Sequence, residues 1–146
     1  MLKRKTKLFL SLIEQSTSTK KPIFKIVVDG NNLSTVGVAH DISTNRCRRD
    51  LTYDLDTVRN IEIHFVNKDP NDTKVQDNKI VEDLLLVLDK ISIDDIDLVG
   101  DLPLISVYRD LNGTVHRTHN YITFNGCITI KIHKNLLYNK WLANHC

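Results

Sequence analysis

Alternating apolar and polar residues dominate the middle of the chain. Residues 61–65 read Ile-Glu-Ile-His-Phe, so every second side chain is apolar. This period of two predicts a half-buried β-strand. A polar, acidic loop at 67–78 separates it from two more apolar runs, at 80–88 and 91–98. The stretch from 59 to 98 therefore predicts long strands around a carboxylate-rich loop, at the centre of an antiparallel sheet.

Shorter alternating runs punctuated by turn residues fill most of the remaining chain. Strands are predicted at 23–28, 104–108, 121–124 and 127–133, and a further short strand is plausible at 51–55. Asp29-Gly30 and two Asn-Gly pairs, at 112–113 and 125–126, are strong hairpin signals. With no alternation of strands and helices, the pattern predicts an all-β antiparallel β-sandwich of jelly-roll type.

The two ends of the chain differ from this pattern. Leu136, Leu137, Trp141 and Leu142 recur near helical spacing, which predicts a short C-terminal helix. Residues 1–21 have a basic head, a short apolar stretch and a polar end without a small-residue cleavage site, which argues against a signal peptide. We expect an extended basic N-terminal arm at 1–21 and a β-sandwich domain at 22–146.

Charge is distributed unevenly. The net charge of the 146 residues is only +2, so nucleic acid is an unlikely partner. Residues 1–21 nevertheless carry +5, whereas residues 67–101 hold ten acidic residues against four lysines. A basic arm could dock onto the acidic body of a neighbouring copy, although a solvated tail would have the same composition. The residues expected to contact such a partner are Lys3, Arg4, Lys5, Lys7 and Phe9.

Composition excludes several other classes of protein. No apolar run approaches the ~18 residues of a membrane span. The three cysteines, Cys47, Cys127 and Cys146, are odd in number and have no motif spacing, so neither a disulfide framework nor a zinc site is predicted. Free thiols fit synthesis in a reducing cytoplasm.

The acidic loop is the best candidate for a metal site. Calcium takes six to eight oxygen ligands, and aspartates, asparagines and loop carbonyls supply them. Four aspartates at 69, 72, 77 and 83 are close enough in sequence to converge, although they do not match an EF-hand. An ordinary solvated acidic loop is the alternative.

No arrangement indicates catalysis. Asp94, Asp95 and Asp97 alternate with isoleucines, which predicts solvent-facing strand positions and not an acid–base pair. The His116–His119 spacing places its two imidazoles on opposite faces of a strand. We therefore expect the protein not to be an enzyme. Trp141 with Tyr138 is either a platform for stacking sugars or, as the leucines around it favour, a core anchor.

Two stretches carry a resemblance to known proteins. They are the strand at 61–69 with Asp77, Asp83 and the run at 91–98, and Asn120-Tyr-Ile-Thr-Phe-Asn-Gly126 with the closing Leu-Tyr-Asn-Lys-Trp-Leu142. Together they resemble small β-sandwich structural proteins of marine and cyanobacterial tailed phages. Those are similar to calcium-dependent xylan-binding carbohydrate modules. The resemblance implies Asp69, Asp77 and Asp83 as calcium ligands, although this chain has Asn67-Lys68-Asp69 where the modules have Asn-Asp.

Two functions follow as expectations. The first is a phage virion structural protein, as a capsid decoration, head–tail or tail component. It would be made in the host cytoplasm and would bind other virion proteins or copies of itself. Many identical copies make a weak contact sufficient. The alternative is a calcium-dependent carbohydrate-binding module for a surface polysaccharide. That alternative predicts an exposed aromatic residue near the acidic loop at 67–78. The sequence disfavours it, because Tyr and Trp are few and none lies within 67–101.

Overall fold

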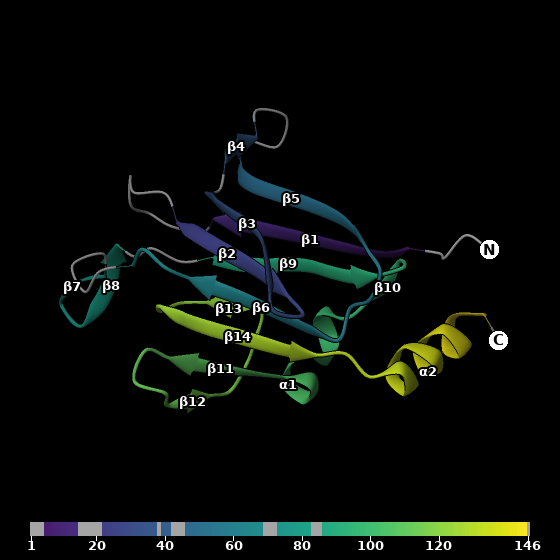
Figure 1. Ribbon diagram of the computed structural model, residues 1–146. Coiled ribbons are helices and arrows are strands. Elements are labelled where there is room, and N and C mark those ends of the chain that lie inside the picture. The colour runs from purple at the N-terminus through teal and green to yellow at the C-terminus, as the bar shows by residue number, and fades with distance from the viewer. Residues whose placement is uncertain are drawn as a thin grey trace.

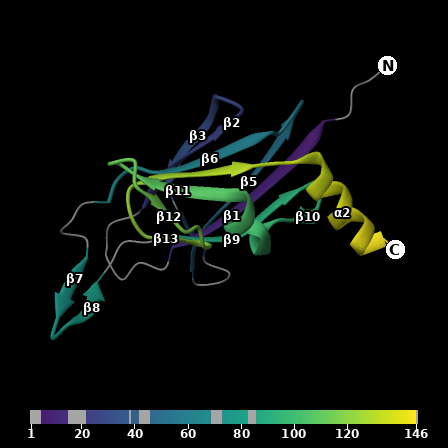
Figure 2. The ribbon, with the colours of Figure 1, turned by 90° about the horizontal axis from the view of Figure 1, so that it is seen from below.

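Two antiparallel β-sheets lie face to face in the computed structural model, with a helix at the C-terminus (Figure 1). The structure describes residues 5–14, 22–37, 39–41, 46–68, 73–82 and 86–145. Viewed from below, the sheets form two layers (Figure 2). The predicted class, an antiparallel β-sandwich with a short C-terminal helix, is confirmed.

The first sheet is built around the N-terminal strand. Its order is β10-β9-β1-β5-β4, and β13 also pairs with β9. The bounds of its strands are β1 Thr6–Glu14, β4 Ala39–Asp41, β5 Arg46–Leu55, β9 Leu86–Ile93, β10 Ile96–Asp97 and β13 Tyr121–Ile122.

The second sheet has the order β12-β11-β14-β6-β2-β3. Its strands are β2 Ile23–Val28, β3 Asn31–Gly37, β6 Asn60–Phe65, β11 Ser106–Asp110, β12 Val115–His116 and β14 Gly126–Lys131. The predicted strands at 23–28, 61–65 and 127–133 form three adjacent strands at its centre, β2, β6 and β14.

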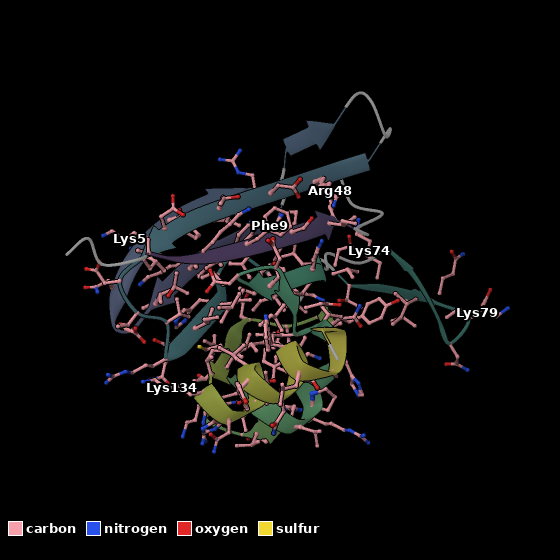
Figure 3. All side chains as sticks on the ribbon, turned by 90° about the vertical axis from the view of Figure 1, so that its right-hand side faces the viewer. Lys5, Phe9, Arg48, Lys74, Lys79 and Lys134 are labelled. Atoms are coloured by element: carbon pink, nitrogen blue, oxygen red, sulfur yellow. The ribbon has the colours of Figure 1, made fainter. Side chains whose placement is uncertain are left out.

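A hairpin, a 3₁₀ turn and two helices complete the described chain. The hairpin of β7 (Lys74–Gln76) and β8 (Lys79–Glu82) projects from the body of the sandwich, as Lys79 shows in Figure 3. A 3₁₀ turn at Val99–Asp101 leads into the one-turn helix α1 (Leu102–Ile105). Helix α2 (Lys134–His145) follows β14. Within the described ranges, no helix has the length and apolar character needed to cross a membrane.

Alternation along the strands creates the core between the sheets. Ile61, Ile63 and Phe65 of β6 are buried, and the residues between them are only half-buried. Strand β14 follows the same rule. Each layer contributes fully buried side chains, including Leu8, Leu10, Leu12, Phe24, Ile26, Leu86, Leu88, Ile91, Ile128 and Ile130. Side chains between the buried ones therefore form the outer face of each sheet.

The hairpin connections explain several turn predictions. Asp29 and Gly30 have positive φ angles of 49° and 84° between β2 and β3, as a type I′ turn requires. At the Asn125-Gly126 pair, glycine is needed for a reason other than turn geometry. A Cβ on Gly126 would lie 2.2 Å from the Arg109 carbonyl oxygen, so this glycine is required by the close approach of β11.

Strand β9 departs from the prediction. The apolar runs at 80–88 and 91–98 do not form one strand each, because β8 ends at Glu82 and β9 spans Leu86–Ile93. Leu88 and Ile91 are three positions apart, so in a regular strand their side chains would point to opposite faces. The register of the pairing between β9 and β1 shifts between them, and both side chains therefore face the core. The run from 91 to 98 is then broken by a two-residue turn at Asp94-Asp95, both with positive φ. Asp94 and Asp95 are therefore turn residues and not strand positions.

The prediction of an extended N-terminal arm is wrong for residues 6–14. They form β1, which pairs with β5 on one side and β9 on the other. Leu8, Leu10 and Leu12 are fully buried. Burying three leucines in the chain's own core is far more favourable than leaving them exposed on a free arm. The proposed domain boundary at residue 21 therefore does not separate an arm from the sandwich.

Candidate functional site

Two aromatic side chains are exposed side by side on helix α2. Tyr138 and Trp141 are three residues apart, which places them on the same side of the helix. Their exposed fractions are 61% and 45%. Leu136 and Leu137, in contrast, pack against the core. The leucines anchor the helix, so the aromatic pair remains accessible.

The aromatic pair faces the turn between β9 and β10. Together they line a cleft of about 310 Å³, formed by Ile93, Asp94, Ile96, Leu137, Tyr138 and Trp141. The Asp94 carboxylate accepts a hydrogen bond of 2.9 Å from the backbone N–H of Lys7, and the backbone N–H of Asp94 donates to the Lys7 carbonyl at 2.9 Å. Strand β1 therefore fixes the position of the turn under the aromatic rings.

A second depression of about 300 Å³ adjoins this cleft, because both are lined by Ile93, Asp94 and Leu137. It adds the side chains of Thr57, Arg59 and Lys134, which offer a hydroxyl, a guanidinium and an ammonium group. Lys134 lies at the start of helix α2 (Figure 3). The combined surface runs from aromatic rings to hydrogen-bonding groups.

Such a surface is suited to binding. Ligand sites combine apolar and aromatic walls with a few placed polar groups. The exposed aromatic residues of α2 lie beside the turn at Asp94-Asp95. They do not lie beside the β7–β8 hairpin at the end of the acidic loop, near which the carbohydrate-binding alternative predicts an aromatic residue (Figure 1). We call the cleft, with the rings of Tyr138 and Trp141 and the carboxylate of Asp94, the aromatic cleft.

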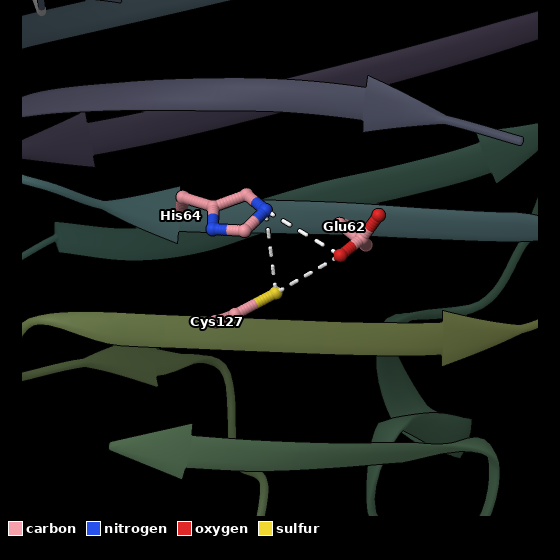
Figure 4. Close-up of side chains that lie close together, drawn as sticks. All are labelled: Glu62, His64 and Cys127. Carbon is pink, nitrogen blue, oxygen red and sulfur yellow. Dashed lines mark hydrogen bonds and ion pairs between the residues drawn. The ribbon is translucent and has the colours of Figure 1, made fainter. Parts of the chain in front are cut away.

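A different group of side chains gathers on the outer face of the second sheet. Glu62 and His64 are two positions apart on β6, so their side chains lie on the same face of the strand. Cys127 of β14 lies directly opposite His64. The Cys127 sulfur is 3.5 Å from Nε2 of His64 and 3.7 Å from Oε1 of Glu62, and these two atoms are 3.5 Å apart (Figure 4). All three side chains are partly buried. We call them the Glu-His-Cys cluster.

This cluster is not built as a nucleophilic triad. The same imidazole nitrogen, Nε2, faces both the thiol and the carboxylate. A triad instead uses one nitrogen for the nucleophile and the other for the orienting acid. Burial raises the pKa of the Cys127 thiol from its ordinary value of 9.0 to about 11, and the nearby Glu62 carboxylate adds to the shift. The thiol is therefore protonated and a poor nucleophile near neutral pH.

The predicted calcium ligands are only partly placed. Asp69 and Asp83 lie outside the described residues. Asp77 lies at the exposed tip of the β7–β8 hairpin, with a φ of 53°. Among the described residues, one group of three His, Cys, Asp or Glu side chains is close enough to hold a metal ion. It is the Glu-His-Cys cluster, which does not include Asp77. A calcium site at these aspartates remains a prediction.

Lys68, which follows β6 closely, is held by hydrogen bonds to the segment before β14. The Asn125 amide accepts a hydrogen bond of 2.8 Å from the Lys68 backbone N–H and donates one to the Lys68 carbonyl. The Lys68 ammonium donates to the carbonyl of Thr123. Lys68 is the residue that departs from the Asn-Asp sequence of the resembled modules, and here its positive charge is directed at a backbone oxygen.

Three of the five residues predicted to contact a partner are described, and they also make contacts within the chain. Lys3 and Arg4 lie outside the described residues. Lys5 forms an ion pair of 2.7 Å with Asp56. Phe9 is half-buried on β1, with the Lys90 ammonium 5.7 Å from its ring centre. Lys5, Lys7 and Phe9 therefore do not belong to a free arm, because all three lie on β1 or directly before it. Their contact with a partner stays a prediction.

Comparison with known proteins supports the fold. No protein-family model matches the chain, and no curated protein sequence matches it. Among solved structures, a calcium-dependent carbohydrate-binding module, vCBM60, is similar, with a TM-score of 0.52 over 87% of this chain and 96% of that chain. The identity is 13%, so the similarity concerns the fold. The resemblance to carbohydrate-binding modules is thereby confirmed at the level of structure, whereas a phage origin stays a prediction.

Proposed function

We propose that the protein is a non-catalytic carbohydrate-binding domain that holds a polysaccharide in the aromatic cleft. The observation that carries the proposal is the exposed pair Tyr138 and Trp141 beside the carboxylate of Asp94. Exposed apolar patches with polar rims are typical of interaction sites. Aromatic rings offer a flat apolar face and a polar tip, which suits the C–H faces and hydroxyl groups of a sugar ring. The sandwich fold shared with a carbohydrate-binding module adds support.

The polar groups around the cleft would supply orientation. A sugar stacked on Trp141 would bring hydroxyl groups toward the Asp94 carboxylate, a strong hydrogen-bond acceptor. A longer chain would continue into the adjoining depression, where Arg59 and Lys134 offer donors. We therefore expect a polysaccharide of several sugar units to bind more tightly than a monosaccharide.

Calcium would act at a different place. The predicted ligand Asp77 lies on the β7–β8 hairpin, at the opposite end of the sandwich from α2 (Figure 1). Asp69 and Asp83 are close to this hairpin in the sequence. Sugar binding in the aromatic cleft is therefore expected to persist when calcium is removed. An absolute requirement for calcium would point to a site near the hairpin instead.

The virion structural role is the first function that the sequence suggested, and it remains a prediction. Its main physical argument was a free basic arm. Strand β1 removes that argument for residues 6–14, because they are paired on both sides within their own sheet. A carbohydrate-binding role is compatible with a place on a particle, so the two functions do not exclude each other.

Affinity electrophoresis tests the proposal. The protein is run through gels containing neutral or acidic polysaccharides, with calcium or with EDTA. We expect retardation by at least one polysaccharide, lost in Tyr138→Ala and Trp141→Ala. Tyr121→Ala is the matched control, because Tyr121 is 49% exposed on β13 but does not line the aromatic cleft. Retardation that survives in both α2 variants would contradict the proposed site, and no retardation by any polysaccharide would contradict the function.

A further inference from the structure

The strand register gives the Glu-His-Cys cluster its shape. Cys127 is the direct cross-strand partner of His64, and Glu62 lies two positions before His64 on β6. Their neighbours Ile61, Ile63 and Ile128 are buried in the core, so the three polar side chains share the outer face of the second sheet. Two central strands of one sheet therefore hold all three, and backbone pairing limits their movement.

We propose that Glu62, His64 and Cys127 form a binding site for one divalent transition-metal ion, with zinc as the preferred ion. The donor atoms are separated by 3.5, 3.5 and 3.7 Å. In a tetrahedral zinc site with bonds of about 2.3 Å to sulfur and about 2.0–2.1 Å to nitrogen and oxygen, donors lie about 3.3–3.6 Å apart. The three atoms therefore already stand at nearly the separation that the ion requires.

The donor types select the ion. Thiolate and imidazole ligands suit zinc and its neighbours in the transition series, whereas calcium and magnesium take oxygen ligands. Binding of the ion would release the thiol proton of Cys127 to solvent. The site is thus chemically separate from the predicted calcium ligands. Three protein donors leave a fourth tetrahedral position for water or another small ligand. His64 and Cys127 also line a depression of about 380 Å³, so this position is accessible from outside the protein.

A single cysteine among such donors escapes motif-based prediction. Cys127 and His64 are 63 positions apart in the sequence, and no motif of cysteine spacing indicates that they lie together. The site exists because β6 and β14 are neighbours in the sheet. It also lies on a different element from the aromatic cleft, so metal binding and sugar binding can be tested separately.

Cobalt(II) titration tests the proposal, because a thiolate bound to cobalt gives a charge-transfer band in the near ultraviolet. The chain has three cysteines, so replacing Cys47 and Cys146 by serine leaves Cys127 as the single thiol. In both the wild type and this background we expect one cobalt ion per chain, displaced by zinc. Cys127→Ser should abolish the band.

His64→Gln provides a second variant that does not depend on the cysteine. It should weaken cobalt binding by more than about 100-fold, since loss of an outer partner alone costs 10–100-fold. His119→Gln is the matched control, as His119 is exposed and belongs to no cluster among the described residues. Circular dichroism checks that each variant folds. No band at millimolar cobalt, or an equal band in His64→Gln, would overturn the proposal, and unchanged cobalt binding in Trp141→Ala would separate it from the proposed function.

Discussion

Leu10→Ala should strongly destabilise the protein, because Leu10 is fully buried in the middle of β1. It pairs with Leu51 on one side and Ile91 on the other. The substitution removes three buried carbon groups at ~0.8 kcal/mol each, which gives about 2.4 kcal/mol. The cavity left behind adds to this cost, so we expect a loss of about 3 kcal/mol in the free energy of unfolding. That is a large share of the ~5–15 kcal/mol by which most domains are stable.

Urea denaturation measures the effect directly. With a denaturant dependence of about 1.5 kcal/mol per molar urea, the midpoint should fall by about 2 M. Phe9→Ala is the comparison, because Phe9 is the next residue but lies on the half-exposed face of β1, and we expect a cost of about 1 kcal/mol. If Leu10→Ala changed the midpoint no more than Phe9→Ala did, β1 would not be a core strand and the N-terminal segment would be an arm after all.

Three further predictions concern single residues. Gly126→Ala should cost about 2–3 kcal/mol in urea denaturation, since its Cβ would lie 2.2 Å from the Arg109 carbonyl oxygen; a neutral effect would mean that β11 and β14 are not so close. Cys127 should react with iodoacetamide at pH 8 about 100-fold more slowly than an unfolded thiol, because its pKa is raised from 9.0 to about 11; equal rates in native protein and in urea would refute this. Asp95→Val should lower stability by about 1–2 kcal/mol and Asp95→Gly should not, because Asp95 has a φ of 67°; similar melting temperatures for the two variants would contradict the turn.

The sequence predicted those parts of the fold where the signal is local. The alternation at 61–65 marks β6, and Asp29-Gly30 marks the β2–β3 turn. The residues of β1 were assigned to an arm although Leu8, Leu10 and Leu12 alternate and an added strand was a possible reading, because the basic residues before them have the composition of a tail. Its partners β5 and β9 are more than 30 residues away in the sequence, and no local pattern shows that they leave a gap for it.

The candidate sites depend even more on long-range pairing. Tyr138 and Trp141 are visible in the sequence, but only the packing of Leu136 and Leu137 against the core decides that the aromatic rings remain outside. Their neighbour Asp94 is more than 40 positions away. Local sequence patterns predict single strands or helices. A site depends on how these elements are aligned with one another, and neither loop lengths nor apolar patterns determine that alignment here.

The indole of Trp141 gives the most direct test of the carbohydrate-binding proposal, because the chain has one tryptophan. Its single indole N–H signal in a proton–nitrogen correlation spectrum can be followed while a polysaccharide that retards the protein is added. We predict a saturable shift of this signal, with the affinity reduced by about 30-fold in Tyr138→Ala, as expected for an aromatic residue at the centre of a site. A polysaccharide that binds while the indole signal stays unchanged would contradict binding in the aromatic cleft.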